Sequence, residues 1–216
     1  HDFRRLPGDK PLGQPMALRL EIRKAVERRQ VALELAKALE VELSDVALTC
    51  EITEAPEVVA ARIREALGVS IDQQRGWATN YEALNTWRRV VERLGVLVFH
   101  ADQIAVKDAR GFSINDRPLP AIVLNAKDVP QARIFTLFHE LTHLLLREGG
   151  LCDLHEDAPR AAGPDAEVFC NHVAGAVIAP ASALSAEPSV MGRSPRASWD
   201  EQEVEALARR YWMSRE

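Results

Sequence analysis

Residues 139–143 read His-Glu-Leu-Thr-His, an HExxH motif. On a helix, His139 and His143 are four positions apart, so both imidazoles lie on one face and can bind the same metal ion. Glu140 lies beside them, where its carboxylate can act as a general base on a water molecule next to the metal rather than bind the metal itself. This combination of residue types and spacing is typical of zinc hydrolases.

The surroundings of the motif favour a metal site over core histidines that only form hydrogen bonds. Residues 134–138 before it and 144–146 after it are apolar nearly all round, in the pattern of a buried central helix. The segment 128–130, Asp-Val-Pro, provides a start for this helix, and Gly149-Gly150 provides a stop. Imidazoles and a carboxylate inside such a helix are costly unless they are paired or bind a metal.

A catalytic zinc site normally has three protein ligands, so a third must lie outside the motif. The extended pattern HExxHxxGxxH fails, because position 146 is Leu and position 149 is Gly. We favour Glu167, which follows His143 by 24 residues and opens an apolar segment of helical spacing that Pro180 ends. Otherwise Glu167 is an acidic residue near a helix N-terminus, where a carboxylate is favoured in any case. The other candidates are Asp153, His155, Glu156, Asp157 and Asp165.

Residues near Glu167 are expected to differ in their relation to the metal. Asn171, four residues on, shares the helical face of Glu167 and could orient a ligand histidine through a hydrogen bond. Cys170 is expected to be a buried, inert thiol. His172 lies roughly 140° round the helix from Glu167 and should point away from the metal. We expect no oxyanion-stabilising role for His155, so that role stays unassigned.

Changes in hydrophobic period predict the elements that position the motif. Amphipathic helices are predicted at residues 56–67, closed by Gly68, and 80–94, closed by Gly95. Three short strands of a small sheet are predicted at 96–100, 111–114 and 121–124, with His100 a surface or packing residue at a strand end. A capping box at Ser198-Trp199-Asp200-Glu201 predicts a final helix through Tyr211. The predicted fold class is α+β.

The segments 133–146 and 167–180 resemble the ImmA/IrrE family of bacterial metallopeptidases. The similarity extends upstream through residues 81–84 and 93–98 and covers roughly residues 55–215. It implies a gluzincin-like zinc peptidase domain in which the three-stranded sheet packs on the HExxH helix. An exposed edge strand of such a sheet can pair with an extended peptide.

The same resemblance implies roles for individual residues. His139, His143 and Glu167 match the metal ligands of the family, and Glu140 matches its catalytic glutamate. Characterised members cleave helix-turn-helix transcriptional repressors and so switch on mobile-element or stress-response genes. The resemblance therefore implies a protein substrate.

Composition fits a cytoplasmic enzyme. With 216 residues, 47% of them hydrophobic, the chain can bury a sizeable core. Its three cysteines have no paired spacing, which favours a reducing compartment. No apolar stretch approaches the ~20 residues of a membrane span, and no signal-peptide pattern opens the chain. The net charge of −5 argues against general nucleic-acid affinity.

We predict a helical N-terminal or linker region at residues 1–78 and the peptidase domain at 79–216. Residues 1–13 look like a connecting segment. Many members of the family carry a helix-turn-helix domain ahead of the peptidase, so the resemblance implies a truncated form of that arrangement, and DNA binding is expected only through such a missing domain. Residues 18–40 predict a charged helix whose apolar side comprises Leu18, Ile22, Val26, Leu33, Ala36 and Leu39. Its basic cluster is expected to be a solvated face interleaved with glutamates, and consists of Arg23, Lys24, Arg28 and Arg29.

The sequence thus predicts a zinc-dependent metalloendopeptidase that cleaves a helix-turn-helix repressor. Other divalent ions such as Mn²⁺ are compatible with a site of two histidines and a glutamate. The alternative is a non-catalytic metal-binding regulatory module that docks to a repressor or to DNA. The intact Glu140 favours the enzyme, because a binding-only descendant is free to lose its general base. Hydrolysis of a small amide stays open.

Overall fold

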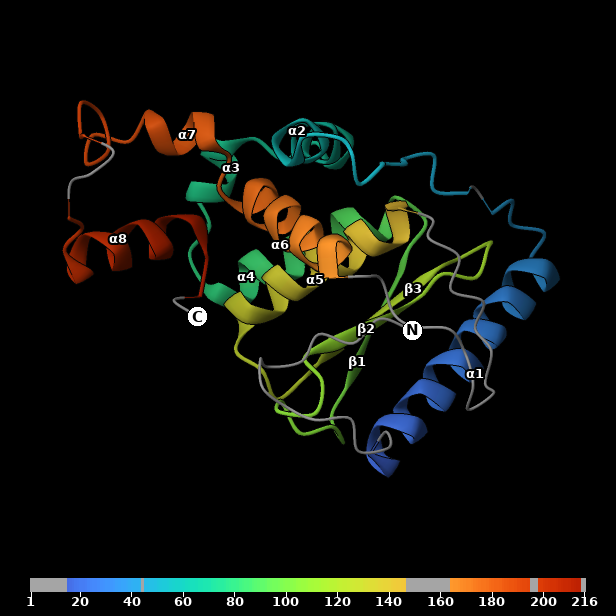
Figure 1. Cartoon of the computed structure of the whole chain (residues 1–216). Helices are drawn as coiled ribbons and strands as arrows, with labels where there is room; N and C mark the ends of the chain where they lie inside the picture. The colour runs from blue at the N-terminus through green and yellow to red at the C-terminus, as the bar shows by residue number, and fades with distance from the viewer. Residues whose placement is uncertain (1–14, 44, 147–163, 195–197, 215–216) are drawn as a thin grey trace.

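The computed structural model describes residues 15–43, 45–146, 164–194 and 198–214. Within these ranges the chain forms eight helices and three strands (Figure 1). The strands make one small sheet, with α1 against one face and a group of helices against the other. This is the predicted α+β fold, a helical N-terminal region followed by a three-stranded sheet packed on the HExxH helix.

The sheet comprises β1 (Leu97–Ala101), β2 (Gly111–Ile114) and β3 (Ala121–Asn125) in the order β1-β3-β2. The central strand β3 pairs parallel with β1 and antiparallel with β2. Each predicted strand lies within about one residue of its observed bounds. Within the described residues, β1 and β2 are the two edge strands.

Side chains alternate between the faces of the sheet, as the two-residue period of a strand requires. In β3, Ile122 and Leu124 join the core shared with the larger group of helices, whereas Ala121 and Val123 join the core shared with α1. In β2, Phe112 and Ile114 face α1. Gly111 and Ser113 therefore face the HExxH helix.

That helix, α5 (Pro130–Leu146), lies at the centre of the larger core. It packs against α6 (Pro164–Ile178), α4 (Asn80–Glu92) and the sheet, and α6 in turn packs against α2 (Pro56–Leu67). An edge-to-face aromatic contact links α4 to α5: the rings of Trp87 and Phe138 have centroids 4.9 Å apart. The Pro130 start is confirmed, and the predicted stop at Gly149-Gly150 lies outside the described residues.

The helices predicted at 56–67 and 80–94 are confirmed, the second ending two residues early, at Glu92. Gly68 caps α2 with a φ of 65°, in the left-handed region that favours glycine. Gly95, in the turn that follows α4, has a φ of 87°.

The N-terminal helix α1 (Met16–Ala38) covers the second face of the sheet through Leu18, Ile22 and Ala25. The prediction that its basic cluster is solvated is wrong for Arg29, which is buried. Arg29 donates hydrogen bonds to the carbonyl oxygens of Leu119 and Pro118, at 2.9 and 2.8 Å. It lies four positions after Ala25 and so shares the sheet-facing side. Leu39, predicted on the apolar side, follows the end of the helix and is exposed.

Three further helices lie toward the C-terminal part of the chain: α3 (Ile71–Arg75), α7 (Ala181–Ser185) and α8 (Glu201–Tyr211). The final helix is confirmed, but its predicted capping box is wrong by two residues. Asp200 is the N-cap and Glu203 completes the box, because the first helical residue is Glu201 rather than Trp199. A second box, Ser70 with Gln73, starts α3 and was not predicted.

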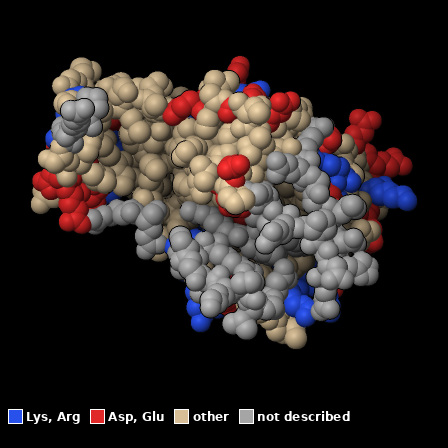
Figure 2. Space-filling view, viewed as in Figure 1, with Lys and Arg blue, Asp and Glu red and all other residues tan. Residues whose placement is uncertain are grey.

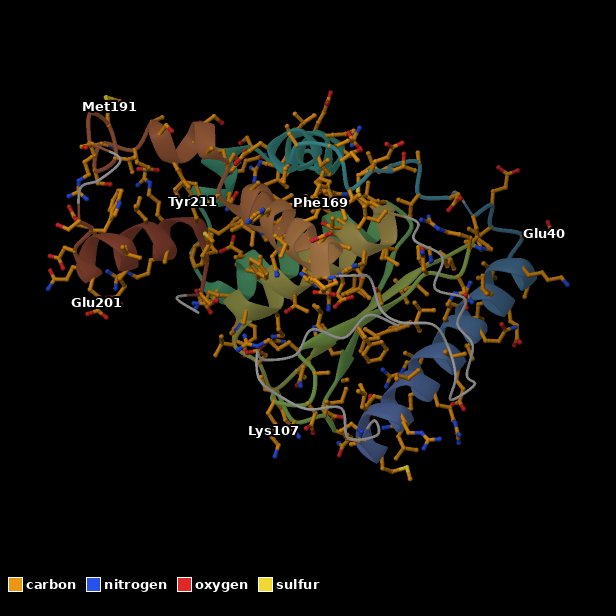
Figure 3. All side chains as sticks on the ribbon, viewed as in Figure 1. Glu40, Lys107, Phe169, Met191, Glu201 and Tyr211 are labelled. Atoms are coloured by element: carbon orange, nitrogen blue, oxygen red, sulfur yellow. The ribbon has the colours of Figure 1, made fainter. Side chains whose placement is uncertain are left out.

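The C-terminal end of α8 is held against α3 by a polar network around the buried carboxylate of Glu187. Tyr211, labelled in Figure 3, donates a hydrogen bond to Glu187 at 2.8 Å. Arg210 donates to the same carboxylate at 3.0 Å, and Arg75 also contacts it. Burial by itself raises the pKa of Glu187, but the Tyr211 hydrogen bond and the two arginines outweigh it and hold this pKa below its ordinary value.

Within the described ranges, none of the helices combines the length and the apolar character needed to cross a bilayer. The division into residues 1–78 and 79–216 stays a prediction.

Candidate metal centre

The HExxH residues lie in the middle of a helix that is buried on nearly every side. Ile134, Leu137 and Leu141 are fully buried in the core. His139 and Glu140 are each 0% exposed, and His143 is 8% exposed. Charged or strongly polar groups at this depth require partners, because burial removes their hydration.

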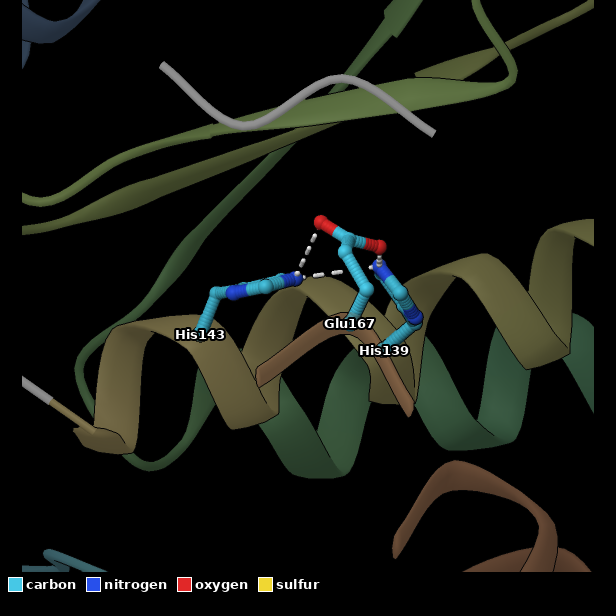
Figure 4. Close-up of side chains that lie close together, drawn as sticks. All are labelled: His139, His143 and Glu167. Atoms are coloured by element: carbon cyan, nitrogen blue, oxygen red, sulfur yellow. Dashed lines mark hydrogen bonds and ion pairs between the residues drawn. The ribbon is translucent and has the colours of Figure 1, made fainter. Parts of the chain in front are cut away.

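Three side chains from two helices converge at one point (Figure 4). His139 and His143 extend from α5, and Glu167 extends from the first turns of α6. The Nε2 atoms of the two histidines are 3.1 Å apart. The Glu167 carboxylate lies 3.4 Å from Nε2 of His139 and 3.5 Å from Nε2 of His143.

These separations fit a single metal ion. Ligand atoms about 2.0–2.1 Å from zinc at the corners of a tetrahedron lie roughly 3.3 Å from one another. The separations of 3.1, 3.4 and 3.5 Å lie close to that value, although Oε2 of Glu167 is the oxygen near His139 and Oε1 is the one near His143. The potential ligand atoms all lie within 4.8 Å of one another, which makes this group a candidate three-ligand site.

Asn171 of α6 fixes the ring of His139. Its Oδ1 lies 3.1 Å from Nδ1 of His139. Because an amide oxygen only accepts hydrogen bonds, this contact favours the tautomer with the proton on Nδ1, which leaves Nε2, the atom near Glu167 and His143, free to bind a metal. The His139 ring also stacks near Phe135, with centroids 6.5 Å apart and planes at 27°. Both contacts orient the imidazole as metal binding requires.

Glu140 lies in the same turn of α5 but points toward the sheet. Its Oε2 accepts a hydrogen bond from Oγ of Ser113 on β2, at 2.8 Å. Both side chains are buried. The carboxylate therefore lies outside the group of three converging ligands and is anchored separately.

Residues 91–216 match the family model of the IrrE N-terminal-like domain, Peptidase_M78, which covers more than half of the chain. The chain belongs to this family. Among curated proteins, none is similar enough to the chain to count as a match.

Membership in this peptidase family gives the site a chemical context. The family has a metallopeptidase-type domain, which implies a metal cofactor and a protein substrate. The group of two histidines and one glutamate on α5 and α6 lies within the matched residues and is compatible with that cofactor.

Among the described residues, the other sequence candidates do not join this group. Asp153, His155, Glu156 and Asp157 lie outside the described residues. Asp165 and His172 of α6 are exposed, and Cys170 is buried in the apolar core. His100 is half-buried on β1, where burial lowers the pKa of its imidazole and the charges of Arg133 and Arg88 lower it further.

The hydrogen bond from Ser113 to Glu140 is not predicted by the sequence. A signal for it exists in β2, whose sequence Gly-Phe-Ser-Ile alternates small or polar residues with large apolar ones. Such alternation indicates that one face of the strand meets something other than an apolar core. The identity of the partner depends on how β2 packs against α5, which local sequence does not encode.

Proposed function

We propose that this protein is a zinc-dependent metalloendopeptidase in which His139, His143 and Glu167 hold the metal and Glu140 is the general base. The observation that carries the proposal is the convergence of two Nε2 atoms and one carboxylate at distances of 3.1 to 3.5 Å. Asn171 supports this site by orienting His139. The family membership supports the same activity.

A bound zinc ion supplies Lewis-acid polarisation of the scissile carbonyl and lowers the pKa of water. Glu140 accepts one proton from the attacking water as the new C–O bond forms. It then delivers that proton to the amide nitrogen as the C–N bond breaks, so one water is consumed and two peptide ends leave. The buried environment of Glu140 keeps bulk water away from this proton transfer.

We propose a helix-turn-helix transcriptional repressor as the substrate, cleaved in the cytoplasm to derepress stress-response or mobile-element genes. The family resemblance supports this choice. Within the described residues β2 is an edge strand, the kind of strand to which an extended peptide can pair, and its four residues are buried in this structure. Acidic and basic side chains are interspersed over the described residues on the face in Figure 2, and the net charge is −5. Neither feature favours DNA as the partner of this region.

The test is turnover of a purified panel of helix-turn-helix repressors at sub-stoichiometric protein. We expect zinc-loaded wild type to remove many equivalents of one repressor and to release two fragments. Glu140→Gln should keep the fold and the zinc yet cleave nothing, and retained cleavage in this variant would refute the assignment of the general base. Stoichiometric binding of a repressor without fragments would instead establish the non-catalytic regulatory module.

A further inference from the structure

The contact between Ser113 and Glu140 joins the sheet to the HExxH helix at the proposed general base. It is a direct hydrogen bond of 2.8 Å between residues 27 positions apart in the chain. Ser113 is 7% exposed and Glu140 is 0% exposed, so water does not compete for it freely. A hydrogen bond to a carboxylate is stronger than one between neutral groups.

Glu140 needs such an anchor because the last torsion of a glutamate is soft. Rotation about the bond that carries the carboxyl group has a broad energy minimum, unlike the staggered torsions before it. When the Ser113 hydroxyl holds Oε2, that rotation is restricted and the position of Oε1 is set as well. A general base must present one oxygen within about 3 Å of the proton that it removes. Fixing the orientation of the Glu140 carboxylate should therefore raise the rate of proton transfer.

The backbone of β2 reaches this position because residue 111 is glycine. A Cβ atom there would lie 2.5 Å from Cγ2 of Thr136 and 2.8 Å from the carbonyl oxygen of Val123. Thr136 is one helical turn before Glu140 on α5, so the close approach occurs beside the Ser113 contact. Gly111 and Ser113 point to the same face of the strand. Gly111 lets β2 lie close to α5, and at that short separation the Ser113 hydroxyl can reach the Glu140 carboxylate.

We propose that Ser113 is a positioning residue for peptide hydrolysis, acting through Glu140 by fixing the orientation of its carboxylate. This inference rests on the proposed function. It assigns a role to the edge strand: β2 holds the general base of α5, the helix that packs against it.

The first test detects the hydrogen bond between Ser113 and Glu140 by NMR and does not depend on turnover. Glutamate labelled with ¹³C at the side-chain carboxyl gives one resonance for each residue, and Glu140→Gln identifies the Glu140 resonance by its loss. Ser113→Ala should shift that resonance, and Ser113→Thr, which retains the hydroxyl, should bring it back toward the wild-type position. An unshifted resonance in Ser113→Ala would overturn the proposal.

The second test measures kcat and KM on one quenched fluorescent peptide, chosen from a random library because the wild type cleaves it. Ser113→Ala should lower kcat by about 10- to 100-fold, as for other residues that orient active-site groups, while KM and zinc per chain stay within about twofold. Ser113→Thr should recover most of kcat. If Ser113→Ala fails to fold, Ser113→Cys, a weak donor of similar size, replaces it.

Ile114→Val is the matched control, because Ile114 lies next to Ser113 on the same strand but faces α1. It should destabilise β2 and leave kcat within about twofold. Equal kcat in Ser113→Ala and wild type, with the resonance shifted, would make the contact purely structural and overturn the proposal. A zinc-loaded wild type that cleaves neither a library peptide nor a repressor of the panel would refute the peptidase function itself, and the role of Ser113 with it.

Discussion

Replacing Asn171 tests whether His139 must be oriented in order to bind metal. Asn171→Ala removes the hydrogen bond of 3.1 Å to Nδ1 of His139 and leaves all three proposed ligands in place. Loss of such an orienting partner typically lowers metal affinity 10- to 100-fold, which corresponds to about 1.4–2.7 kcal/mol. We expect the lower half of that range, because the stacking of Phe135 on His139 retains part of the orientation.

The assay is competition for zinc against a fluorescent chelator, with the free energy of unfolding measured in the metal-free protein. Asn171 is exposed on α6, and alanine is a better helix former, so the fold should be retained. His172→Ala is the matched control, because His172 is the next residue on the same helix and is also exposed. A zinc affinity of Asn171→Ala within twofold of the wild type would refute the reasoning, as would an equal loss in His172→Ala.

Three further predictions concern packing, pH and metal. Gly111→Ala should lower the free energy of unfolding by about 1–3 kcal/mol in urea titrations, because its Cβ meets Thr136 at 2.5 Å; an unchanged midpoint would contradict the close approach. Glu187→Gln should lower the free energy of unfolding at pH 7 by about 1.5–3 kcal/mol, because Arg75 and Arg210 lose their ionised acceptor. The pKa of Glu187 is below its ordinary 4.5 in the folded protein, so its contribution is present above pH 4.5 and is lost as the pH falls through the folded value; the variant should lack this part of the acid destabilisation. Zinc at 100 times its dissociation constant should stabilise the wild type by about 2.7 kcal/mol, and the same concentration should have little effect on Glu167→Ala in thermal unfolding.

Local pattern predicts much of this fold because the site depends on elements with strong periodicity. The apolar run around the HExxH motif specifies a buried helix, and α5 begins at the predicted Pro130. The alternating strand 111–114 has its predicted bounds. Their spacing predicts that Glu167 and Asn171 share one face of one helix, and both side chains lie beside His139. The helical period alone brings these two residues to the same side.

What the sequence did not predict depends on packing between distant segments. In the sequence, Arg29 is indistinguishable from the other basic residues of a charged helix. In the structure it donates hydrogen bonds to the carbonyl oxygens of Pro118 and Leu119, 89 and 90 residues away. Ser113 reads as a polar residue in a short strand, and its partner is determined by how close β2 lies to α5. The capping box was misplaced for a local reason, because Ser198 and Asp200 are both good N-caps two residues apart.

The most direct test of the metal centre is zinc per chain, measured by plasma mass spectrometry in wild type, Glu167→Ala and Asp165→Ala. Asp165 is the matched control, an exposed acidic residue in the first turn of the same helix. We expect about one zinc in the wild type and in Asp165→Ala, and a large loss in Glu167→Ala, because a site of three protein ligands loses one. Full zinc content in Glu167→Ala, or none in wild type supplied with zinc, would contradict the proposed site.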